Sequence, residues 1–484
     1  MTMTHAAADY FEHVADRWDN LVSGFFTTAV RDAAIAKAYL HPEMSVADVG
    51  AGTGFMAAGL APTVSRVHVV DGSAAMLDVA RRNLGQFSNI EYHHADGGSL
   101  PLPDESVDVA FANMYLHHCP DPLAAIHEMM RIVKPGGRLV ITDLDPHTDD
   151  WLKTDMADEW MGFGRDQMRA WFRQADLVNV VVDSTGQSCC IGAAAPEITD
   201  KQGRSARISI FVAAGSKRIS MRAAVQEAYG AVARGGGGCT GDAPAPSDCC
   251  SEANSDSACC GGGIDLPQQD VLFMTDYAAD ELAAVPLEAE TISLGCGNPV
   301  ALAGLRPGET VLDIGSGGGL DVFLAAQRVG SQGRVIGVDM TPDMLERATN
   351  TAVQAGIQNV EFRRGQAEQL PVADESVDVV LSNCVINLCE DKGAVFADAY
   401  RALKPGGRLE ISDMVTGGAL PLAARHDAGG WAGCISGALP EREYLDLVAG
   451  AGFTDVAARR SVSAGQLAGV PVYSVIVSAR KPDV

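Results

Sequence analysis

The sequence predicts an α/β fold that is built twice, in two domains that follow one another along the chain. Two segments recur 270 residues later: LPLPDESVDVAFAN (100–113) returns as LPVADESVDVVLSN (370–383), and RIVKPGGRLVITD (131–143) returns as RALKPGGRLEISD (401–413). Within each repeat, apolar runs alternate with helical patterns, which is typical of βαβ units with a mostly parallel sheet. The chain has 484 residues, 47% of them hydrophobic, which is enough for two cores of ordinary size.

The elements of the two repeats follow in the same order. The first repeat is expected to begin with a helix from Ala6 to about Trp18. VADVGAGTG is an apolar run that ends in spaced glycines, so it predicts a strand, a tight turn and the start of a helix. This run lies at 46–54, and further strands are expected at 66–72, at 107–113 and after the KPGG turn at 134–137. In the second repeat the corresponding segments are 309–319, 333–340, 359–370, 377–383 and the KPGG turn at 404–407.

The boundary between the domains is expected near residue 218. FVAAGSKR at 211–218 resembles the closing segment SVIVSARK at 474–481, so each marks the last strand of its domain. The predicted domains are therefore 1–218 and 219–484. The second includes a Cys/Gly-rich loop at 235–263, where glycine, serine, proline and aspartate exclude a packed core.

Composition narrows the classes of function. The net charge of −26 argues against nucleic acid as a partner, because phosphate binding needs a basic surface. No apolar stretch approaches the roughly 20 residues that span a bilayer, and no signal peptide is recognisable, so we expect a cytoplasmic protein without a membrane partner. The twelve cysteines of so long a chain are more typical of metal-binding or catalytic thiols than of a disulfide scaffold.

Each repeat places a GxGxG loop after its first strand and an acidic residue at the end of its second strand. Such a loop lets a ligand approach the backbone, and the acid can bind ribose hydroxyls. Asp71 follows Gly54 by 17 residues, and Asp339 follows Gly319 by 20. This spacing predicts a cofactor site in both repeats.

Together with DESVDV and KPGGRL, these loops make both repeats resemble class I S-adenosylmethionine-dependent methyltransferases. The resemblance implies two tandem Rossmann-like domains, each a mostly parallel sheet with helices on both faces, and S-adenosyl-L-methionine as cofactor. In the second repeat it implies a cofactor site of Asp313, Gly315, Gly317 and Gly319 at the methionine end, Asp339 and Met340 at the ribose, Ala367 and Glu368 at the adenine, and Asn383. The first repeat offers Asp48, Gly50, Gly52, Gly54, Asp71 and Asp96.

Three cysteines of the second repeat have no thiol counterpart in the first. Cys384 follows the fourth strand, Cys296 precedes the first strand, and Cys434 lies in a segment expected to cover the site. Ligands of open α/β sheets bind at the carboxyl edge of the strands, so the three thiols are expected to converge there. Spacing alone leaves open whether they hold a thiophilic substrate or zinc.

The second repeat further resembles the arsenite methyltransferases, through AVQEAYGAVA, LGCGNP, VLDIGSGGGLD, GVDMT, NCVINL and GCISGAL in that order across 219–484. The resemblance implies that Cys296, Cys384 and Cys434 bind trivalent arsenic as thiolates, and that its lone pair attacks the cofactor's methyl group. It also implies a thiol reductant, thioredoxin or glutathione, and arsenite or an arsenic–thiol conjugate as substrate. The resemblance also implies an upstream cysteine that acts as a disulfide partner supplying electrons or as part of substrate delivery. We take Cys250 as the candidate, with Cys239, Cys249, Cys259 and Cys260 as alternatives.

The role of the first domain is left open by its sequence. His117 or His118 offers acid–base chemistry, although a packing role is preferred, and the aromatic residues of 151–163 belong either to the core or to a substrate cage. Three roles are open: methylation of a separate small molecule, action on a product of the second domain, or service as a cofactor-binding regulatory partner. Cys189 and Cys190 suggest a fourth role, in which they pass a metalloid to the second domain.

The sequence therefore predicts an arsenite methyltransferase for arsenic detoxification. Two rival hypotheses are methylation of an organic molecule with zinc on the cysteines, and a metalloid-binding protein without catalysis.

Overall fold

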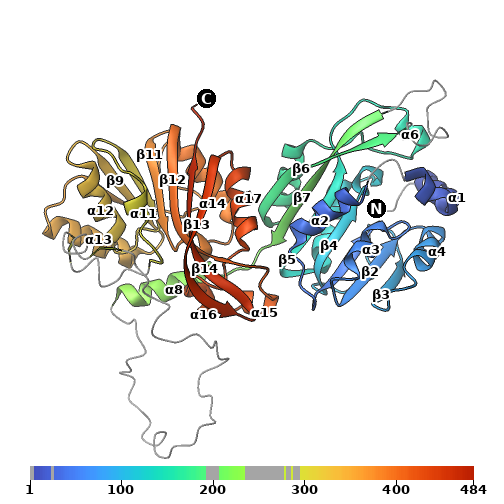
Figure 1. The fold of residues 1–484 in the computed structure, drawn as a ribbon, viewed down its shortest axis with the longest axis horizontal. Coiled ribbons are helices and arrows are strands. Elements are labelled where there is room, and N and C mark those ends of the chain that lie inside the picture. Colours follow the sequence, from blue (N-terminus) through green and yellow to red (C-terminus); the bar gives the residue numbers. More distant parts are fainter. Residues whose placement is uncertain are drawn as a thin grey trace, which may run out of the picture. The chain divides into compact units, whose positions relative to one another are not determined.

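The computed structural model describes residues 5–22, 27–191, 206–234, 277–278, 285–286 and 295–483. The chain divides into two compact units, one of Met1–Ile219 with Pro421–His426, the other of Ser220–Leu420 with Asp427–Val484. Each unit contains one seven-stranded sheet with helices (Figure 1). Cys239, Cys249, Cys250, Cys259 and Cys260 lie outside the described residues, as does most of the segment before Cys296.

The sheet of the first unit has the order β3-β2-β1-β4-β5-β7-β6. All neighbours from β3 to β5 are parallel, whereas β7 pairs antiparallel with both β5 and β6. The strands are β1 (Ser45–Val49), β2 (Arg66–Asp71), β3 (Ile90–His94), β4 (Val107–Asn113), β5 (Val133–Leu144), β6 (Leu177–Ile191) and β7 (Ala206–Lys217). The helices are α1 (His5–Val22), α2 (Thr28–Ala38), α3 (Phe55–Leu60), α4 (Ala74–Asn83), the short 3-10 helix η1 (Leu116–His118), α5 (Pro122–Ile132), α6 (Leu152–Asp155), α7 (Arg165–Gln174) and α15 (Leu422–Arg425).

The second unit has the equivalent order, β10-β9-β8-β11-β12-β14-β13. Its strands are β8 (Thr310–Ile314), β9 (Arg334–Asp339), β10 (Val360–Arg364), β11 (Val377–Asn383), β12 (Leu403–Thr416), β13 (Thr454–Leu467) and β14 (Val470–Arg480). Its described helices are α8 (Arg222–Ala233), α11 (Pro299–Leu302), α12 (Leu320–Val329), α13 (Pro342–Gln354), η3 (Ile386–Leu388), α14 (Lys392–Ala402), α16 (Ala428–Ala432) and α17 (Glu441–Gly450). The predicted α/β fold with two mostly parallel sheets is confirmed.

Alternation along the strands explains why helices cover both faces. In β1, Val46 joins a core cluster with residues of α2, α3 and α4, whereas Ala47 and Val49 join a second cluster with residues of α5 and α7. Successive side chains of a strand point to opposite faces, so a strand that is apolar throughout must be covered twice. The continuous apolar runs of the sequence are the consequence.

The KPGG segments differ from the prediction that they are turns before a strand. In each unit the extended strand already begins at Val133 or Leu403, and the segment forms an irregularity within it. The register with β4 moves from Val107↔Val133 to Val109↔Arg138, so extra residues bulge out of β5. The bulge requires a left-handed backbone at Gly136, where φ is 77°.

Among the described residues, no helix combines the length and the apolar character needed to cross a membrane.

Candidate active site

The glycine loop of the second unit connects β8 to α12 at the carboxyl edge of the sheet. Gly315, Gly317 and Gly319 have φ values of 74°, 47° and 93°, a region that favours glycine. The backbone N–H of Gly315 donates to the carbonyl of Val338 over 2.7 Å, which ties the loop to the end of β9. Asp339 completes the turn by accepting from Gly317 N over 3.0 Å.

A cavity of about 120 Å³ lies above this loop. Gly319 does not line it; this glycine precedes α12, where a Cβ atom would press on Phe323 and Phe362. The other predicted cofactor residues of the second repeat all line the cavity, namely Asp313, Gly315, Gly317, Asp339, Met340, Ala367, Glu368 and Asn383.

The lining fits a ligand with hydroxyl groups and a positive centre, as S-adenosylmethionine has. The buried Ser316 hydroxyl has no hydrogen-bond partner among the described residues, and a Cβ atom at Gly317 would project into open space. Burial raises the pKa of Asp313 well above its ordinary value, with Asp321 and Asp339 adding repulsion, and burial also raises the pKa of Asp339. Cationic and hydroxyl groups would stabilise these carboxylates.

Helix α8 supplies three cavity residues for which the sequence predicted no role, Arg222, Val225 and Tyr229. Arg222 forms an ion pair with Glu368 over 2.7 Å. The hydroxyl of Tyr229 donates to the carbonyl of Ala432 over 3.2 Å and lies 3.8 Å from the Cys434 sulfur. The AYG segment that contains Tyr229 contributed to the resemblance, but no local pattern shows that this helix lines the cavity of the glycine loop.

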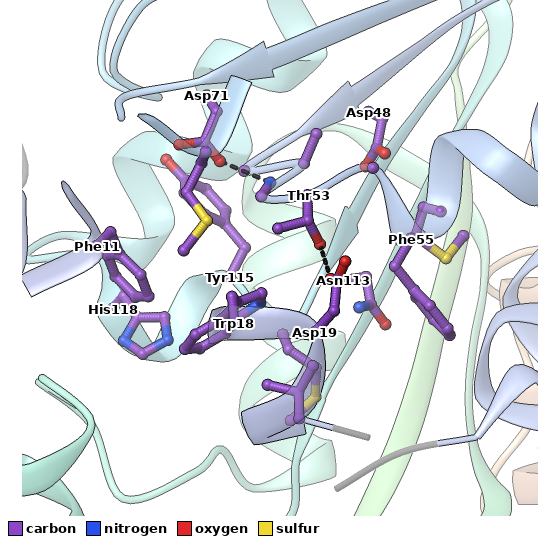
Figure 2. A pocket seen from close by; sticks show the side chains of 18 of the residues that line it. Phe11, Trp18, Asp19, Asp48, Thr53, Phe55, Asp71, Asn113, Tyr115 and His118 are labelled. Carbon is purple, nitrogen blue, oxygen red and sulfur yellow. Dashed lines mark hydrogen bonds between the residues drawn. The ribbon is translucent and has the colours of Figure 1, made fainter. Parts of the chain in front are cut away.

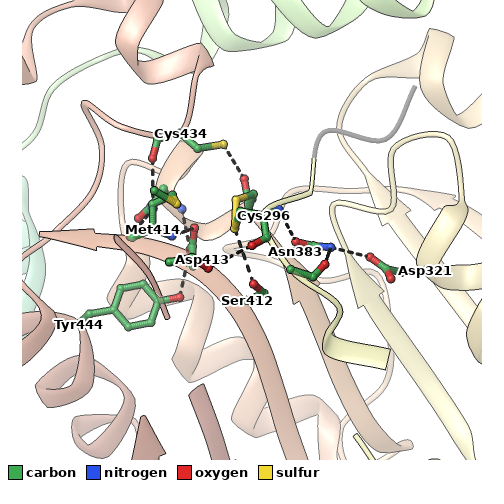
Figure 3. Close-up of a disulfide and its surroundings, with 12 residues drawn as sticks. Cys296, Asp321, Asn383, Ser412, Asp413, Met414, Cys434 and Tyr444 are labelled. Atoms are coloured by element: carbon green, nitrogen blue, oxygen red, sulfur yellow. Dashed lines mark hydrogen bonds between the residues drawn. A yellow bond between two sulfur atoms is a disulfide. The ribbon is translucent and has the colours of Figure 1, made fainter. Parts of the chain in front are cut away.

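The three predicted cysteines come together at Cys384, which lines this cavity. Figure 3 shows the disulfide with Cys296 and Cys434 labelled. Cys296 and Cys384 form a disulfide with a Cα–Cα distance of 5.7 Å. Cys434 is a free, buried thiol whose Sγ donates to the Cys384 carbonyl over 2.8 Å. Burial raises the pKa of Cys434 to about 12. The structure thus differs from the expectation of three thiolates: two sulfurs are oxidised to a disulfide and the third is a neutral thiol.

Asn383 holds the Cys296 segment against the end of β11. Its Oδ1 accepts from Cys296 N over 2.9 Å, and its Nδ2 donates to the Gly297 carbonyl over 2.7 Å and to Asp321 over 3.1 Å. Asn383 was predicted to bind the cofactor; it lines the cavity, and its amide also positions a cysteine.

Left-handed backbone occurs at two of the three cysteines. Cys384 has φ 57° and Cys434 has φ 61°, values that are uncommon for residues other than glycine. Strained backbone tends to gather at functional sites, where surrounding contacts maintain it. At Cys384 the N–H donates to the Ser412 carbonyl over 2.8 Å, which secures the turn that aims the side chain at Cys296.

The glycine loop of the first unit borders a larger cavity, of about 370 Å³ (Figure 2). The predicted residues that line it are Asp48, Gly50, Gly52, Gly54 and Asp71. Asp96 does not line it and instead accepts from Gly98 N over 3.0 Å. Asp48 accepts from Ala57 N over 3.0 Å, and its burial raises its pKa to about 7.

His117 is a buried, paired side chain. Its Nδ1 lies 2.7 Å from Asp143, and its Nε2 lies 3.7 Å from Asp158. These two carboxylates outweigh the effect of burial and raise the pKa of His117 to about 9. Desolvation lowers the pKa of His118 well below its ordinary value. The two histidines therefore carry different charges at neutral pH.

The other features singled out in the first repeat divide between core and cavity. Phe163 is fully buried in the core cluster against which Trp160 packs. Leu152, Met156 and Asp158 line the cavity. Cys189 also lines it, while the side chain of Cys190 lies outside the described part of the chain.

Two segments of the chain match models described as a methyltransferase domain, residues 47–141 and residues 305–466. Each contains the glycine loop, the fourth strand and the KPGG segment of its unit. The two mostly parallel sheets with helices are thus tandem Rossmann-like domains of the class I methyltransferase type.

Arsenite methyltransferases are among the relatives. That of Halobacterium salinarum is 44% identical over 49% of this chain and 58% of its own length. That of Aquipseudomonas alcaligenes is 40% identical over 41% of this chain and 56% of its own length. The chain therefore spans little more than half the length of these relatives. A solved arsenic(III) S-adenosylmethionine methyltransferase from Chlamydomonas reinhardtii is 36% identical over 42% of this chain and 73% of that chain, with a TM-score of 0.39.

Proposed function

We propose that the second domain is an arsenite methyltransferase that transfers methyl groups from S-adenosylmethionine to trivalent arsenic, and that it serves arsenic detoxification in the cytoplasm. The observation that carries this proposal is the convergence of Cys296, Cys384 and Cys434, from three separate segments, beside the cavity of the glycine loop. Three sulfur atoms suit a thiophilic substrate. The similarity to arsenite methyltransferases supports the same substrate.

Substrate binding requires reduction of the Cys296–Cys384 disulfide first. Two electrons and two protons from a thiol reductant, thioredoxin or glutathione, give two thiols beside that of Cys434. Arsenite, As(OH)₃, then exchanges its three hydroxyl groups for three sulfurs. Each thiol proton leaves with a hydroxide as water, so no thiolate needs to exist beforehand and the high pKa of Cys434 is no obstacle.

S-Adenosylmethionine would supply an electrophilic methyl group on its sulfonium. Asp313, Gly315 and Gly317 would hold its methionine end, Asp339 and Met340 its ribose, and Ala367 and Glu368 its adenine. The residues of this chain would position the cofactor and the arsenic and exclude water from the site. Tyr229 and the buried Cys434 close the sulfur side, and a dry, aligned site favours attack by the arsenic lone pair.

The decisive experiment measures transfer of labelled methyl from S-adenosylmethionine to arsenite by the full chain with a thiol reductant. Cys384→Ser is expected to abolish labelled methylarsenicals. Cys119→Ala, which removes a buried thiol from the first domain, is the matched control and should retain them. Absence of transfer by the unmodified chain, with cofactor binding demonstrated, would reject arsenite. Methylation of an organic acceptor, with zinc bound to the protein, would then become the preferred hypothesis. Arsenic binding without methyl transfer would instead indicate a metalloid-binding protein.

A further inference from the structure

The two glycine-loop sites differ in the side chain at one equivalent position. In each repeat a left-handed residue follows the fourth strand, Met114 with φ 53° and Cys384 with φ 57°, and the next side chain packs on the first glycine of the loop. That side chain is Val385 in the second domain and Tyr115 in the first. A Cβ atom on Gly315 or Gly50 would overlap it, so both loops depend on glycine for this contact.

The two side chains reach different distances across the site. In the second domain, Val385 stops short, and Gly365, Gln366, Ala367 and Glu368 line the cavity at its proposed adenine end. In the first domain, the corresponding residues 95–98 do not appear among the residues lining the cavity. The ring of Tyr115 extends from Gly50 to Gly97, where a Cβ atom would overlap its hydroxyl. Gly97 corresponds to Ala367, so the larger side chain is matched by a smaller neighbour.

A shortage of total space in the first domain does not explain this difference. The first cavity is the larger, about 370 Å³ against about 120 Å³. Residues of α1 line it, among them Phe11 and Trp18, which lie near His118 (Figure 2). Tyr115 itself is only 5% exposed. The phenol therefore fills the place that the second domain leaves open for a flat heterocycle.

We propose that Tyr115 excludes adenine from the first domain, so that the full chain binds one S-adenosylmethionine, in the second domain. The inference rests on the proposed cofactor of that domain. It departs from the expectation that Asp48, Gly50, Gly52, Gly54, Asp71 and Asp96 bind a second cofactor. The glycine loop and Asp71 of the first domain are then a scaffold whose cavity is free for a ligand without adenine.

The test is the stoichiometry of S-adenosylmethionine binding to the full chain, measured by calorimetry without arsenite. One site per chain is expected for the wild type and two for Tyr115→Val, which installs the side chain of the second repeat. Tyr115→Phe keeps the ring and should remain at one. The reciprocal pair Val385→Tyr with Ala367→Gly should lower the stoichiometry to zero, with thermal melting as the check of folding.

Two sites in the wild type would overturn the inference, because Tyr115 would then move aside for the cofactor. A folded Tyr115→Val that gains no site would overturn it too, because the phenol would not be the obstacle. A wild type without any site would contradict the proposed function of the second domain instead. In that case a gain of one site in Tyr115→Val would still support the inference, and no gain would reject it.

Discussion

The thiol of Cys434 donates a hydrogen bond to the backbone carbonyl of Cys384 over 2.8 Å, although the two residues lie 50 positions apart. This contact holds the third sulfur beside the Cys296–Cys384 disulfide while the thiol stays protonated. A sulfur donor placed in this way needs no large movement once the disulfide is reduced.

Cys434→Ser is expected to weaken arsenite binding by at least 10–100-fold, since loss of a direct ligand should cost no less than loss of an outer-shell partner. The hydroxyl retains a hydrogen bond to the Cys384 carbonyl, so stability should change little. Titration of the reduced chain with arsenite measures the affinity. Equal affinity of variant and wild type would show that Cys434 is not a ligand.

Asn383 provides a second test, because its amide donor can be removed while the acceptor oxygen is kept. Asn383→Asp keeps the acceptor for Cys296 N but loses the donor to the Gly297 carbonyl, and it adds a negative charge next to Asp321. Asn383→Ala loses the acceptor and the donor together. We expect a loss of about 1–3 kcal/mol of stability in Asn383→Ala and slower methylation in both variants. Denaturant unfolding combined with the methyl-transfer assay separates the two effects; unchanged transfer would show that the Cys296 segment does not depend on this amide.

The pKa of Asp48 makes the stability of the first domain depend on pH. Its folded pKa of about 7 lies above its ordinary value of 3.8, so the folded state holds the proton more tightly. The resulting stabilisation is complete below about pH 4 and is lost as the pH rises through about 7.

Asp48→Asn should therefore reduce, by roughly 1–4 kcal/mol, the loss of unfolding free energy of the first domain between pH 4 and 7. Tryptophan fluorescence can follow the unfolding, because Trp18, Trp151, Trp160 and Trp171 lie in the first unit and only Trp431 in the second. If the unfolding free energies of variant and wild type changed in parallel with pH, Asp48 would not be the group responsible.

Arg222→Ala tests the contribution of α8 to the second cavity. Arg222 is 35% exposed, so its ion pair with Glu368 should contribute no more than about 1 kcal/mol to stability. The same residue lines the cavity, and we expect a few-fold higher KM for S-adenosylmethionine with little change in melting temperature. Arg442→Ala, on α17, is the control; an equal change in KM there would remove the case for Arg222.

Local sequence was sufficient to predict the location of a site residue wherever that location depends only on the residue's position along one strand. Asp339 ends β9 and Asn383 ends β11, so a parallel sheet brings both to the same edge, and the apolar runs already indicated that sheet. The repeats likewise predicted equivalent strand orders, because the same pattern of strands and crossovers folds in the same way twice. The KPGG segments were misread as turns, since a bulge and a turn both use glycine with positive φ.

The sequence by itself determined the two α/β domains, the glycine loops and the identity of the cysteines. Only the tertiary structure decided which two cysteines are joined, that α8 carries Arg222 and Tyr229 to the cavity, and that Tyr115 reaches Gly97. The physical reason is the distance along the sequence over which each kind of interaction acts. Hydrophobic periodicity and turn chemistry act over a few residues, whereas Cys296 and Cys384 are separated by 88 residues, and Tyr229 and Cys434 by 205. Such contacts form only when whole elements pack, and their partners are selected by the shape of the core.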